Sequence, residues 1–234
     1  IKVMNLVNFF EREAGKILVD FATPGWMTLT EDLRSNTSSS ITKRTFDICA
    51  SVVLLLATWP IMLITALAIW IEDGLKAPVF FSQQRVGLNG KAFQVLKFRS
   101  MSIDAEGDGK ARWATVNDSR VTRVGAFIRR TRIDELPQIF NVLSGEMAFI
   151  GPRPERPEFV QQLAERIPYY NSRHAVKPGI TGWAQLCYPY GASEEDARQK
   201  LQFDLYYVKN QSLFLDLMVT LRTVEVVLFG KGAR

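Results

Sequence analysis

The chain has 234 residues, of which 47% are hydrophobic and 23% are charged, which is enough apolar material for one sizeable core. This composition excludes a disordered or collagen-like chain. Lys and Arg outnumber Asp and Glu by 29 to 24, and the net charge of +5 favours an anionic partner such as a nucleotide, a phospholipid or a nucleic acid. The two cysteines, Cys49 and Cys187, provide no disulfide framework, which argues against a stapled secreted scaffold and fits a reducing compartment.

The first 41 residues differ in character from the rest of the chain. They mix short apolar clusters with charges and run into the polar stretch SNTSSSIT at 35–42. Such a stretch is typical of a linker, and the opening residues have no signal-peptide pattern. We therefore expect residues 1–41 to be the linker or tail of a missing N-terminal part, followed by one domain over 42–234.

An apolar run from Ile48 to Ile71 is the strongest local signal. It holds 24 residues without a charge, which is long enough for a helix that spans a membrane. Pro60, in the middle of the run, removes a helical hydrogen bond. The sequence therefore predicts a kink at Trp59 and Pro60, with a half-helix on each side.

The charges on both sides of this run indicate how it would lie in a membrane. Lys43 and Arg44 precede it, and residues 76–132 carry twelve Lys or Arg against four acidic residues. Basic flanks stay on the cytoplasmic side, so both ends favour the same face of the membrane. We therefore expect residues 43–71 to form a re-entrant helix in the inner leaflet, with a simple span and a buried core helix as alternatives.

The pattern beyond this run predicts a small domain of the α+β class that is predominantly helical. Apolar-rich segments flank Asn89-Gly90, which is a strong signal for a small β-hairpin, and residues 101–120 are polar and aperiodic, as in a mobile loop. Further along we expect a tight turn at 177–182 and helices over 121–132, from 136 onward, 157–167, 193–209 and 216–229. The last of these helices fits either the core or the membrane interface.

Asp134 and Glu135 are the main candidates for chemistry. They lie at the start of a predicted helix and follow the arginines Arg129, Arg130 and Arg132. Nearby cations keep carboxylates ionised, which suits a nucleophile or a ligand of a divalent metal. Adjacent acids at a helix start also serve as simple caps, so both interpretations stand.

Several basic residues in or beside turns could bind phosphate oxygens, namely Lys97, Arg99, Arg129 and Arg153. The alternative is a solvated face or contacts with lipid headgroups. His174 is the only histidine, and we interpret it as incidental to any chemistry. The sequence has no Walker motif, no GxGxxG and no zinc spacing, and its aromatic pairs are more typical of a core or a membrane interface than of base stacking, so we expect no nucleic-acid partner.

Four segments, read in order, carry a family resemblance. They are KRTFDI, FFSQQRVGLNGKAFQVLKFRSM, DSRVTRVGAFIRRTRIDELPQIFNVLSGEMAFIGPRP and KPGITGWAQL. Over about residues 42–234 the chain resembles the bacterial sugar transferase family, the monotopic polyprenyl-phosphate phosphoglycosyl transferases. The resemblance implies transfer of a sugar-1-phosphate from a UDP-sugar to undecaprenyl phosphate with release of UMP, the membrane step that initiates exopolysaccharide, capsule or O-antigen repeats.

The resemblance also implies roles for particular residues. Asp134 would attack the sugar-bearing phosphorus and form a covalent phosphosugar-aspartyl enzyme, with Glu135 as its partner and Mg²⁺ bound by this pair. The remaining assignments are phosphate-binding residues and one further polar residue of the site: Arg129, Arg153, Lys97, Arg99 and Asp204.

Location and partners follow from the same resemblance. It implies the bacterial inner membrane, with the active site facing the cytoplasm, and it allows a homodimer. The family's membrane helix breaks at a proline after a small or polar residue, whereas here the bulky Trp59 precedes Pro60. Two rival functions remain at this stage: a membrane glycosyltransferase that moves only the sugar and releases UDP, and a non-catalytic scaffold that holds anionic lipids and partner proteins.

Overall fold

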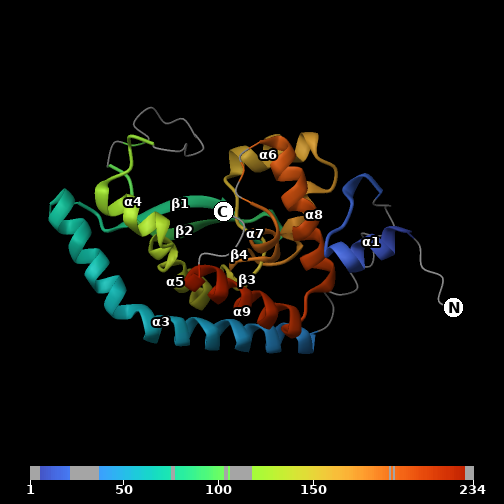
Figure 1. The fold of residues 1–234 in the computed structure, drawn as a ribbon, viewed down its shortest axis with the longest axis horizontal. Coiled ribbons are helices and arrows are strands. Elements are labelled where there is room, and N and C mark those ends of the chain that lie inside the picture. Colours follow the sequence, from blue (N-terminus) through green and yellow to red (C-terminus); the bar gives the residue numbers. More distant parts are fainter. Residues whose placement is uncertain are drawn as a thin grey trace.

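The structure is a computed structural model that describes residues 6–21, 37–74, 77–102, 105, 118–189, 191 and 193–229. These residues are mainly helical and contain two small sheets, which confirms the α+β class with helices predominating. In chain order (Figure 1) the elements are α1 (Leu6–Ala14), η1 (Val19–Phe21), α3 (Thr37–Asp73), β1 (Phe80–Val86), η2 (Leu88–Gly90), β2 (Ala92–Phe98), α4 (Arg123–Arg130), η3 (Ile133–Glu135), α5 (Gln138–Ser144), β3 (Ala148–Ile150), α6 (Pro157–Arg166), η4 (Tyr170–Ala175), β4 (Gly179–Thr181), α7 (Trp183–Cys187), α8 (Glu194–Asn210) and α9 (Leu213–Phe229).

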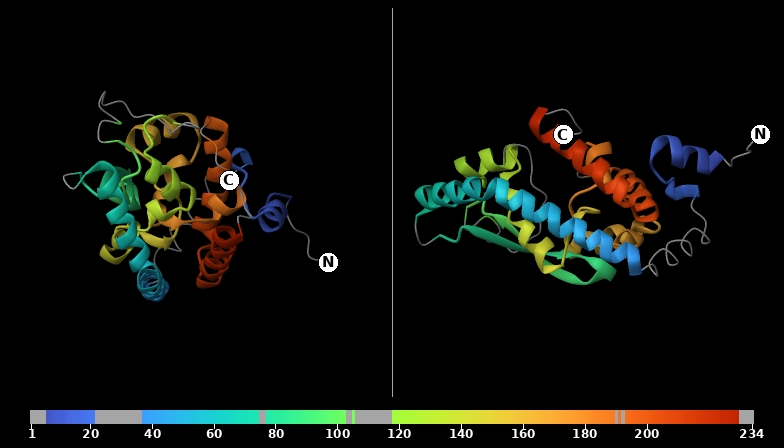
Figure 2. Two further views of the ribbon diagram at one scale, coloured as in Figure 1. Left: turned by 60° about the vertical axis from the view of Figure 1, so that its left-hand side comes forward. Right: turned by 90° about the horizontal axis from the view of Figure 1, so that it is seen from below.

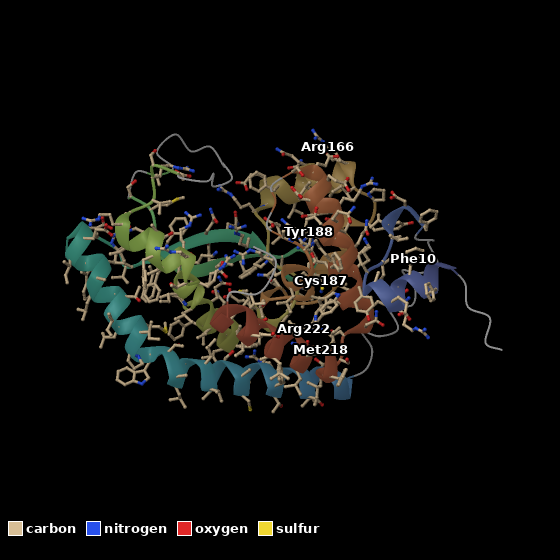
Figure 3. All side chains as sticks on the ribbon, in the orientation of Figure 1. Phe10, Arg166, Cys187, Tyr188, Met218 and Arg222 are labelled. Atoms are coloured by element: carbon tan, nitrogen blue, oxygen red, sulfur yellow. The ribbon has the colours of Figure 1, made fainter. Side chains whose placement is uncertain are left out.

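The apolar run forms one long helix, α3, along the base of the molecule (Figure 1). Pro60 lies inside it, and the ribbon changes direction part-way along its length. By length and composition, the stretch from Ser40 to Asp73 is apolar enough to cross a membrane. Large apolar side chains remain exposed, such as Val53 at 66% and Ile71 at 85%, and side chains project from the lower edge of α3 away from the body (Figure 3). This exposure does not match a buried core helix.

The N-terminal end of α3 is fastened to the domain by the two basic residues that flank the apolar run. Arg44 donates to two carbonyls near the C-terminus of α5, at 2.6 and 2.8 Å, where a cation offsets the free carbonyl groups. Lys43 forms ion pairs with Asp47 at 2.8 Å and with Asp216 of α9 at 2.9 Å. Lys43 and Arg44 therefore bind groups of the folded domain.

The C-terminal end of α3 is attached to the same folded body. The Glu72 carboxylate accepts hydrogen bonds from the amides of Arg123 and Val124, at 2.8 and 3.0 Å, and so caps the N-terminus of α4. Asp73 forms an ion pair of 2.9 Å with the buried Arg99. Both ends of the apolar helix are thus tied to one domain.

The predicted β-hairpin is confirmed. β1 and β2 pair antiparallel, from Phe80 opposite Phe98 to Val86 opposite Ala92. Asn89 adopts a φ of 56° in the connection between the strands, a left-handed conformation that asparagine tolerates better than most residues. The predicted loop over 101–120 lies for the most part outside the described residues.

The tight turn expected at 177–182 is instead a strand, which corrects the prediction. β4 pairs in parallel with β3, with Ala148 opposite Gly179 and Ile150 opposite Thr181. A Cβ added to Gly179 would lie 2.1 Å from the amide nitrogen of Gly151, so glycine lets the two strands approach closely. A three-residue strand bounded by Pro and Gly has no periodic signal, and this is why the pattern indicated a turn.

The C-terminal helix α9 has one face buried against the domain and one exposed apolar face. Leu215, Asp216 and Val219 are buried against the domain, while Phe214 and Leu221 on the outer face are 77% and 63% exposed. Seen from below, α9 lies beside the N-terminal half of α3 (Figure 2), and the two helices are in contact.

Residues 6–21 form an ordered strap along α8, although this part of the chain was expected to be a linker or tail. Glu11 pairs with Lys209 at 2.7 Å near the C-terminal end of α8, and the Ile17 amide donates to the carbonyl of Gln202 at 3.0 Å. The side chains of Ile17 and Val19 are buried in a core cluster shared with α6 and α8. The strap therefore contributes to the core of the domain.

Replacing Ile17 by alanine should lower the free energy of unfolding by about 2–5 kcal/mol, because it leaves a cavity in this core. Thermal melts of the purified protein would measure the loss. Phe21→Ala is the matched control, since Phe21 lies in the same strap and is 65% exposed. Equal melting temperatures for the two variants would contradict a core role for the strap.

Candidate functional site

The two carboxylates lie on a single tight turn between α4 and α5. Arg132 precedes this turn with a φ of 61°, in the left-handed region that an arginine seldom adopts. The turn η3 then presents Asp134 and Glu135 to the interior, and each residue is only 8% exposed. The predicted position at the start of a helix is confirmed, with Pro137 leading directly into α5.

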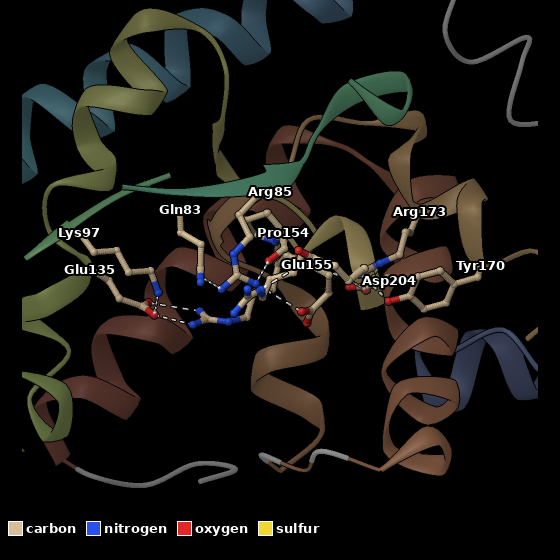
Figure 4. A network of polar contacts seen from close by, with 12 residues as sticks. Gln83, Arg85, Lys97, Glu135, Pro154, Glu155, Tyr170, Arg173 and Asp204 are labelled. Atoms are coloured by element: carbon tan, nitrogen blue, oxygen red, sulfur yellow. Dashed lines mark hydrogen bonds and ion pairs between the residues drawn. The ribbon is translucent and has the colours of Figure 1, made fainter. Parts of the chain in front are cut away.

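Glu135 is held by cations from two other parts of the chain (Figure 4). Arg153 Nη2 lies 2.5 Å from Glu135 Oε1, Arg153 Nη1 lies 3.3 Å from Oε2, and Lys97 Nζ of β2 lies 3.2 Å from Oε1. Burial opposes ionisation of this carboxyl, but Arg153 and Lys97 outweigh it and hold the pKa of Glu135 well below its ordinary value. Glu135 is therefore a permanent buried anion that gathers Lys97 and Arg153.

Asp134 has a different environment although it is the next residue toward the N-terminus. Its Oδ1 atom is buried and has no hydrogen-bond partner among the described residues. Burial and the adjacent charge of Glu135 raise the pKa of Asp134, and this outweighs the opposing effect of Lys97 and Arg153. A buried oxygen without a partner is costly unless a ligand or reaction uses it, so the Asp134 carboxylate differs from that of Glu135 in having an oxygen available for such a contact.

Arg153 lies just after β3, and its backbone carbonyl accepts a hydrogen bond from the arginine of a buried ion pair (Figure 4). Arg173 Nη2 donates to the carbonyl of Arg153 at 2.9 Å and to Asp204 Oδ2 of α8 at 2.7 Å, and Arg173 Nη1 donates to the Tyr170 hydroxyl at 3.0 Å. The resemblance had assigned Asp204 to the polar site. The structure brings Asp204 to Arg173, from where it acts on Arg153 through the intervening guanidinium.

A small basic pocket opens beside these groups. Arg85, Val95, Lys97, Gln138, Arg153 and Pro154 line it. Three of these side chains are cationic, and guanidinium groups suit paired contacts with phosphate oxygens. The positive charge of this lining is therefore complementary to the negative charge of a phosphate group.

Arg85 is the functional candidate that the sequence-based reasoning missed. It lies on β1, donates to the carbonyl of Pro154 at 3.2 Å, to Gln83 Oε1 at 2.6 Å and to Glu155 Oε2 at 3.5 Å. Burial lowers the pKa of Arg85, because its pairing with Glu155 offsets only part of the desolvation. The segment FFSQQRVGLNGKAFQVLKFRSM contains it, but only the three-dimensional pairing of β1 with β2 reveals that it faces the same pocket as Lys97.

Two other arginines predicted for the site have no hydrogen bond or ion pair with the two carboxylates among the described residues. Arg129 is on α4, and within the described residues no hydrogen bond or ion pair joins it to Asp134 or Glu135. Arg99 is buried and pairs with Asp73 at the end of α3. Arg129 stays a prediction from the resemblance, whereas the observed contact of Arg99 is with the membrane-length helix.

His174 does not take part in this arrangement. It is buried in η4, and burial together with the neighbouring Arg173 lowers the pKa of His174 to about 3. A neutral imidazole of such low basicity is a poor general base near pH 7. This agrees with the interpretation of His174 as incidental.

A divalent metal would have few protein ligands here. Among the described residues, no group of three or more His, Cys, Asp or Glu side chains converges to hold a metal ion. Mg²⁺ commonly binds through one or two carboxylates together with substrate phosphates. The unpartnered oxygen of Asp134 fits that mode, while both oxygens of Glu135 already accept hydrogen bonds from cations.

Comparison with known proteins places this site in a family. The model of the family described as "Bacterial sugar transferase" matches residues 38–230. UDP-N-acetylgalactosamine-undecaprenyl-phosphate N-acetylgalactosaminephosphotransferase of Aeromonas hydrophila is 49% identical over 192 residues, which cover 82% of this chain and 45% of that protein. UDP-glucose:undecaprenyl-phosphate glucose-1-phosphate transferase of Escherichia coli (strain K12) is 42% identical over 193 residues, which cover 82% of this chain and 41% of that protein.

The relatives differ in how much surrounds the shared domain. The chain spans less than half the length of these two proteins. In contrast, the match to the uncharacterized sugar transferase EpsL of Bacillus subtilis, 40% identical over 196 residues, covers 82% of this chain and 90% of that protein. The family match extends from the start of α3 to the end of α9 and encloses both carboxylates and the basic pocket. The chain therefore belongs to the bacterial sugar transferase family.

Proposed function

We propose that this protein transfers a sugar-1-phosphate from a UDP-sugar to undecaprenyl phosphate and releases UMP. The observation that supports the proposal is the buried carboxylate of Asp134, next to Glu135, whose ion-pair partners Lys97 and Arg153 line the basic pocket. The names of the relatives from Aeromonas hydrophila and Escherichia coli describe transfers of this class. Such a step would initiate an exopolysaccharide, capsule or O-antigen repeat.

The proposed reaction has two displacements at the same phosphorus. A carboxylate oxygen of Asp134 attacks the phosphorus that carries the sugar, a bond forms between them, and the bond from that phosphorus to the bridging oxygen breaks as UMP leaves. An oxygen of undecaprenyl phosphate then attacks the same phosphorus and displaces the Asp134 carboxylate. The product is undecaprenyl-diphosphate-sugar, and the enzyme returns to its starting state.

The remaining groups would stabilise charge during both steps. Glu135 forms ion pairs with Lys97 and Arg153 and so holds both side chains in place near Asp134. Fixed donors aimed at developing negative charge on phosphate oxygens are the main source of catalysis in phosphoryl transfer. Mg²⁺, with Asp134 and Glu135 as candidate ligands beside the diphosphate, would neutralise further charge when bound.

The geometry of α3 supports a re-entrant insertion in preference to a straight span. Lys43 and Arg44 attach its beginning to the domain, and Glu72 and Asp73 attach its end. A helix that crossed the bilayer would hold its two ends about 30 Å apart on opposite sides of the membrane. We infer that α3 enters and leaves through one face, with its bend near Pro60 in the inner leaflet and the site facing the cytoplasm.

Asp134→Asn should abolish release of UMP in nanodiscs that contain undecaprenyl phosphate and Mg²⁺, when a panel of UDP-sugars is offered. The amide is nearly isosteric but a very poor nucleophile, so melting temperature and binding to the membrane should not change. The nucleotide released by the wild-type protein is identified in the same assay. Substantial turnover by the variant would remove Asp134 as the nucleophile.

The same experiment separates the rival functions. Release of UDP by the wild type would indicate simple glycosyl transfer. Binding to liposomes without turnover of any UDP-sugar would favour a scaffold. Exchange of labelled UMP into the UDP-sugar without undecaprenyl phosphate is expected only if the first displacement forms a covalent intermediate.

The rate of UMP release should fall on the acid side at a pH above the ordinary aspartate pKa of about 3.9, because the pKa of Asp134 is raised and only its ionised form attacks.

Glu135→Gln should slow the reaction severely. When the residual single-turnover rate of this variant is plotted against pH, the fall on the acid side should lie at a lower pH than in the wild type. Removing the adjacent negative charge and freeing Lys97 and Arg153 both lower the pKa of Asp134. A shift to higher pH would contradict this electrostatic account.

Arg85→Gln should raise the KM for the UDP-sugar by about tenfold to a hundredfold, the usual worth of a hydrogen bond to a charged group. Arg130→Gln is the matched control, because it removes an exposed guanidinium from α4. Arg129→Ala in the same assay tests the assignment made from the resemblance. Equal KM values for the Arg85 and Arg130 variants would exclude Arg85 from the phosphate pocket.

A further inference from the structure

Three buried polar side chains and the partly buried Lys43 meet where α3, α8 and α9 come together. Lys43 Nζ lies 2.8 Å from Asp47 Oδ1 and 2.9 Å from Asp216 Oδ2, and the Tyr207 hydroxyl lies 2.7 Å from Asp216 Oδ1. Asp47, Tyr207 and Asp216 are each at most 2% exposed. These four residues are called the α3 cluster below.

The α3 cluster forms hydrogen bonds with the backbone of the last two residues of β3. The amide of Phe149 donates to Asp47 at 3.0 Å, and the carbonyl of Ile150 accepts from Lys43 at 3.2 Å and from Tyr207 at 2.9 Å. Asp216 acts on the same strand through Lys43 and Tyr207. Side chains from two helices, ordered by a third, therefore fix the end of a three-residue strand.

Stability alone does not explain this arrangement. The α3 cluster contains two carboxylates and one ammonium, and burying such charges costs several kcal/mol before pairing offsets it. Well-packed apolar side chains of similar size would often be as stable or more so. What the charges add is directional contact with the backbone of Phe149 and Ile150, which apolar side chains cannot make.

The segment between β3 and Arg153 is short and closely packed. Arg153 follows Ile150 by three residues, and the amide of Gly151 between them donates to the carbonyl of Thr181 at 3.0 Å. A Cβ on Gly151 would lie 2.4 Å from the carbonyl oxygen of Lys177, so the backbone here is packed against β4. A displacement of Ile150 would therefore be passed on to Arg153.

We propose that the α3 cluster is a positioning device that sets Arg153 against Glu135 and so couples the seating of the membrane helix to the phosphate pocket. Lys43, Asp47, Tyr207 and Asp216 are positioning residues in this scheme and do not touch the substrate. The proposal rests on the proposed function for its catalytic consequence. Its mechanical part, the restraint of the chain from β3 to Arg153, does not depend on that function.

Tyr207→Phe is the sharpest single change, because it removes one hydroxyl and leaves the pair of Lys43 and Asp216 in place. With the UDP-sugar that the wild type turns over, kcat/KM for that sugar should fall about tenfold, while the melting temperature and binding to vesicles stay close to those of the control. Tyr206→Phe is the matched control, since it removes a hydroxyl from the next residue of α8, which packs against Trp183. Asp216→Asn, which keeps a hydrogen-bond partner for Tyr207, should cause a loss of the same order and serves if Tyr207→Phe folds poorly.

A double-mutant cycle with Arg153→Lys separates positioning from general destabilisation. If the α3 cluster acts through Arg153, the tenfold effect of Tyr207→Phe should largely vanish in the Arg153→Lys background. Effects that simply multiply, or a wild-type kcat/KM for both Tyr207→Phe and Asp216→Asn, would overturn the proposal.

Hydrogen exchange tests the mechanical part without any assay of turnover. Peptides that cover residues 148–156 should exchange at least severalfold faster in Tyr207→Phe than in Tyr206→Phe, while peptides from β1 and β2 stay unchanged. If the wild type releases no UMP, the proposed function fails, yet this measurement still decides whether the α3 cluster restrains the chain. Equal exchange over 148–156 would refute the restraint whatever the activity.

Discussion

The buried ion pair between Glu135 and Arg153 is the contact on which the rest of the site depends. A carboxylate this deeply buried is costly unless cations meet it, and here one comes from β2 and another from the loop after β3. The pair thereby joins three segments that are distant in sequence. Among the described residues no ion pair joins a cation to the adjacent Asp134, and the pKa values of the two neighbouring carboxyl groups move in opposite directions. Such a separation gives two groups of the same type different charge states at one pH, as the proposed function requires.

A second constraint is that the basic pocket belongs to a domain with a long apolar helix on its surface. The helices α3 and α9 lie side by side and in contact (Figure 2), and each leaves large apolar side chains exposed. The anchors of α3 at Lys43, Arg44, Glu72 and Asp73 are all charged groups that bind polar partners on the domain. Charged anchors at both ends disfavour the withdrawal of either end into the hydrocarbon core.

Periodicity and turn chemistry predicted much of the architecture from the sequence. The hairpin at Asn89-Gly90 and the helices expected over 157–167 and 193–209 rest on local rules, and the structure confirms them as β1 with β2, α6 and α8. The strand β4 was missed because three residues between Pro and Gly carry no period. The order in residues 6–21 was missed because it depends on packing against α8, which no local pattern reveals.

The same distinction applies to the site. The adjacent acids and the arginine of the GPRP loop stand out in the sequence because their residue types and neighbours suggest chemistry. Arg85 does not, since its place in the pocket beside Lys97 depends on the pairing of β1 with β2. Arg99 was a phosphate candidate on residue type, but its contact is with Asp73, and this too is a tertiary fact.

The routes that converge on Arg153 suggest why so much of the fold surrounds one short loop. Its side chain is bound by Glu135, its carbonyl is held by Arg173, and its backbone continues from a strand end that the α3 cluster holds. A guanidinium that is to meet a phosphate in the transition state contributes most when it does not have to reorganise. Arg173 in turn depends on Asp204 of α8, the helix that the strap of residues 6–21 covers. A change in the position of α3 or of α8 would therefore act on the same guanidinium. Arg153 is thus linked both to the long apolar helix and, through α8, to residues 6–21.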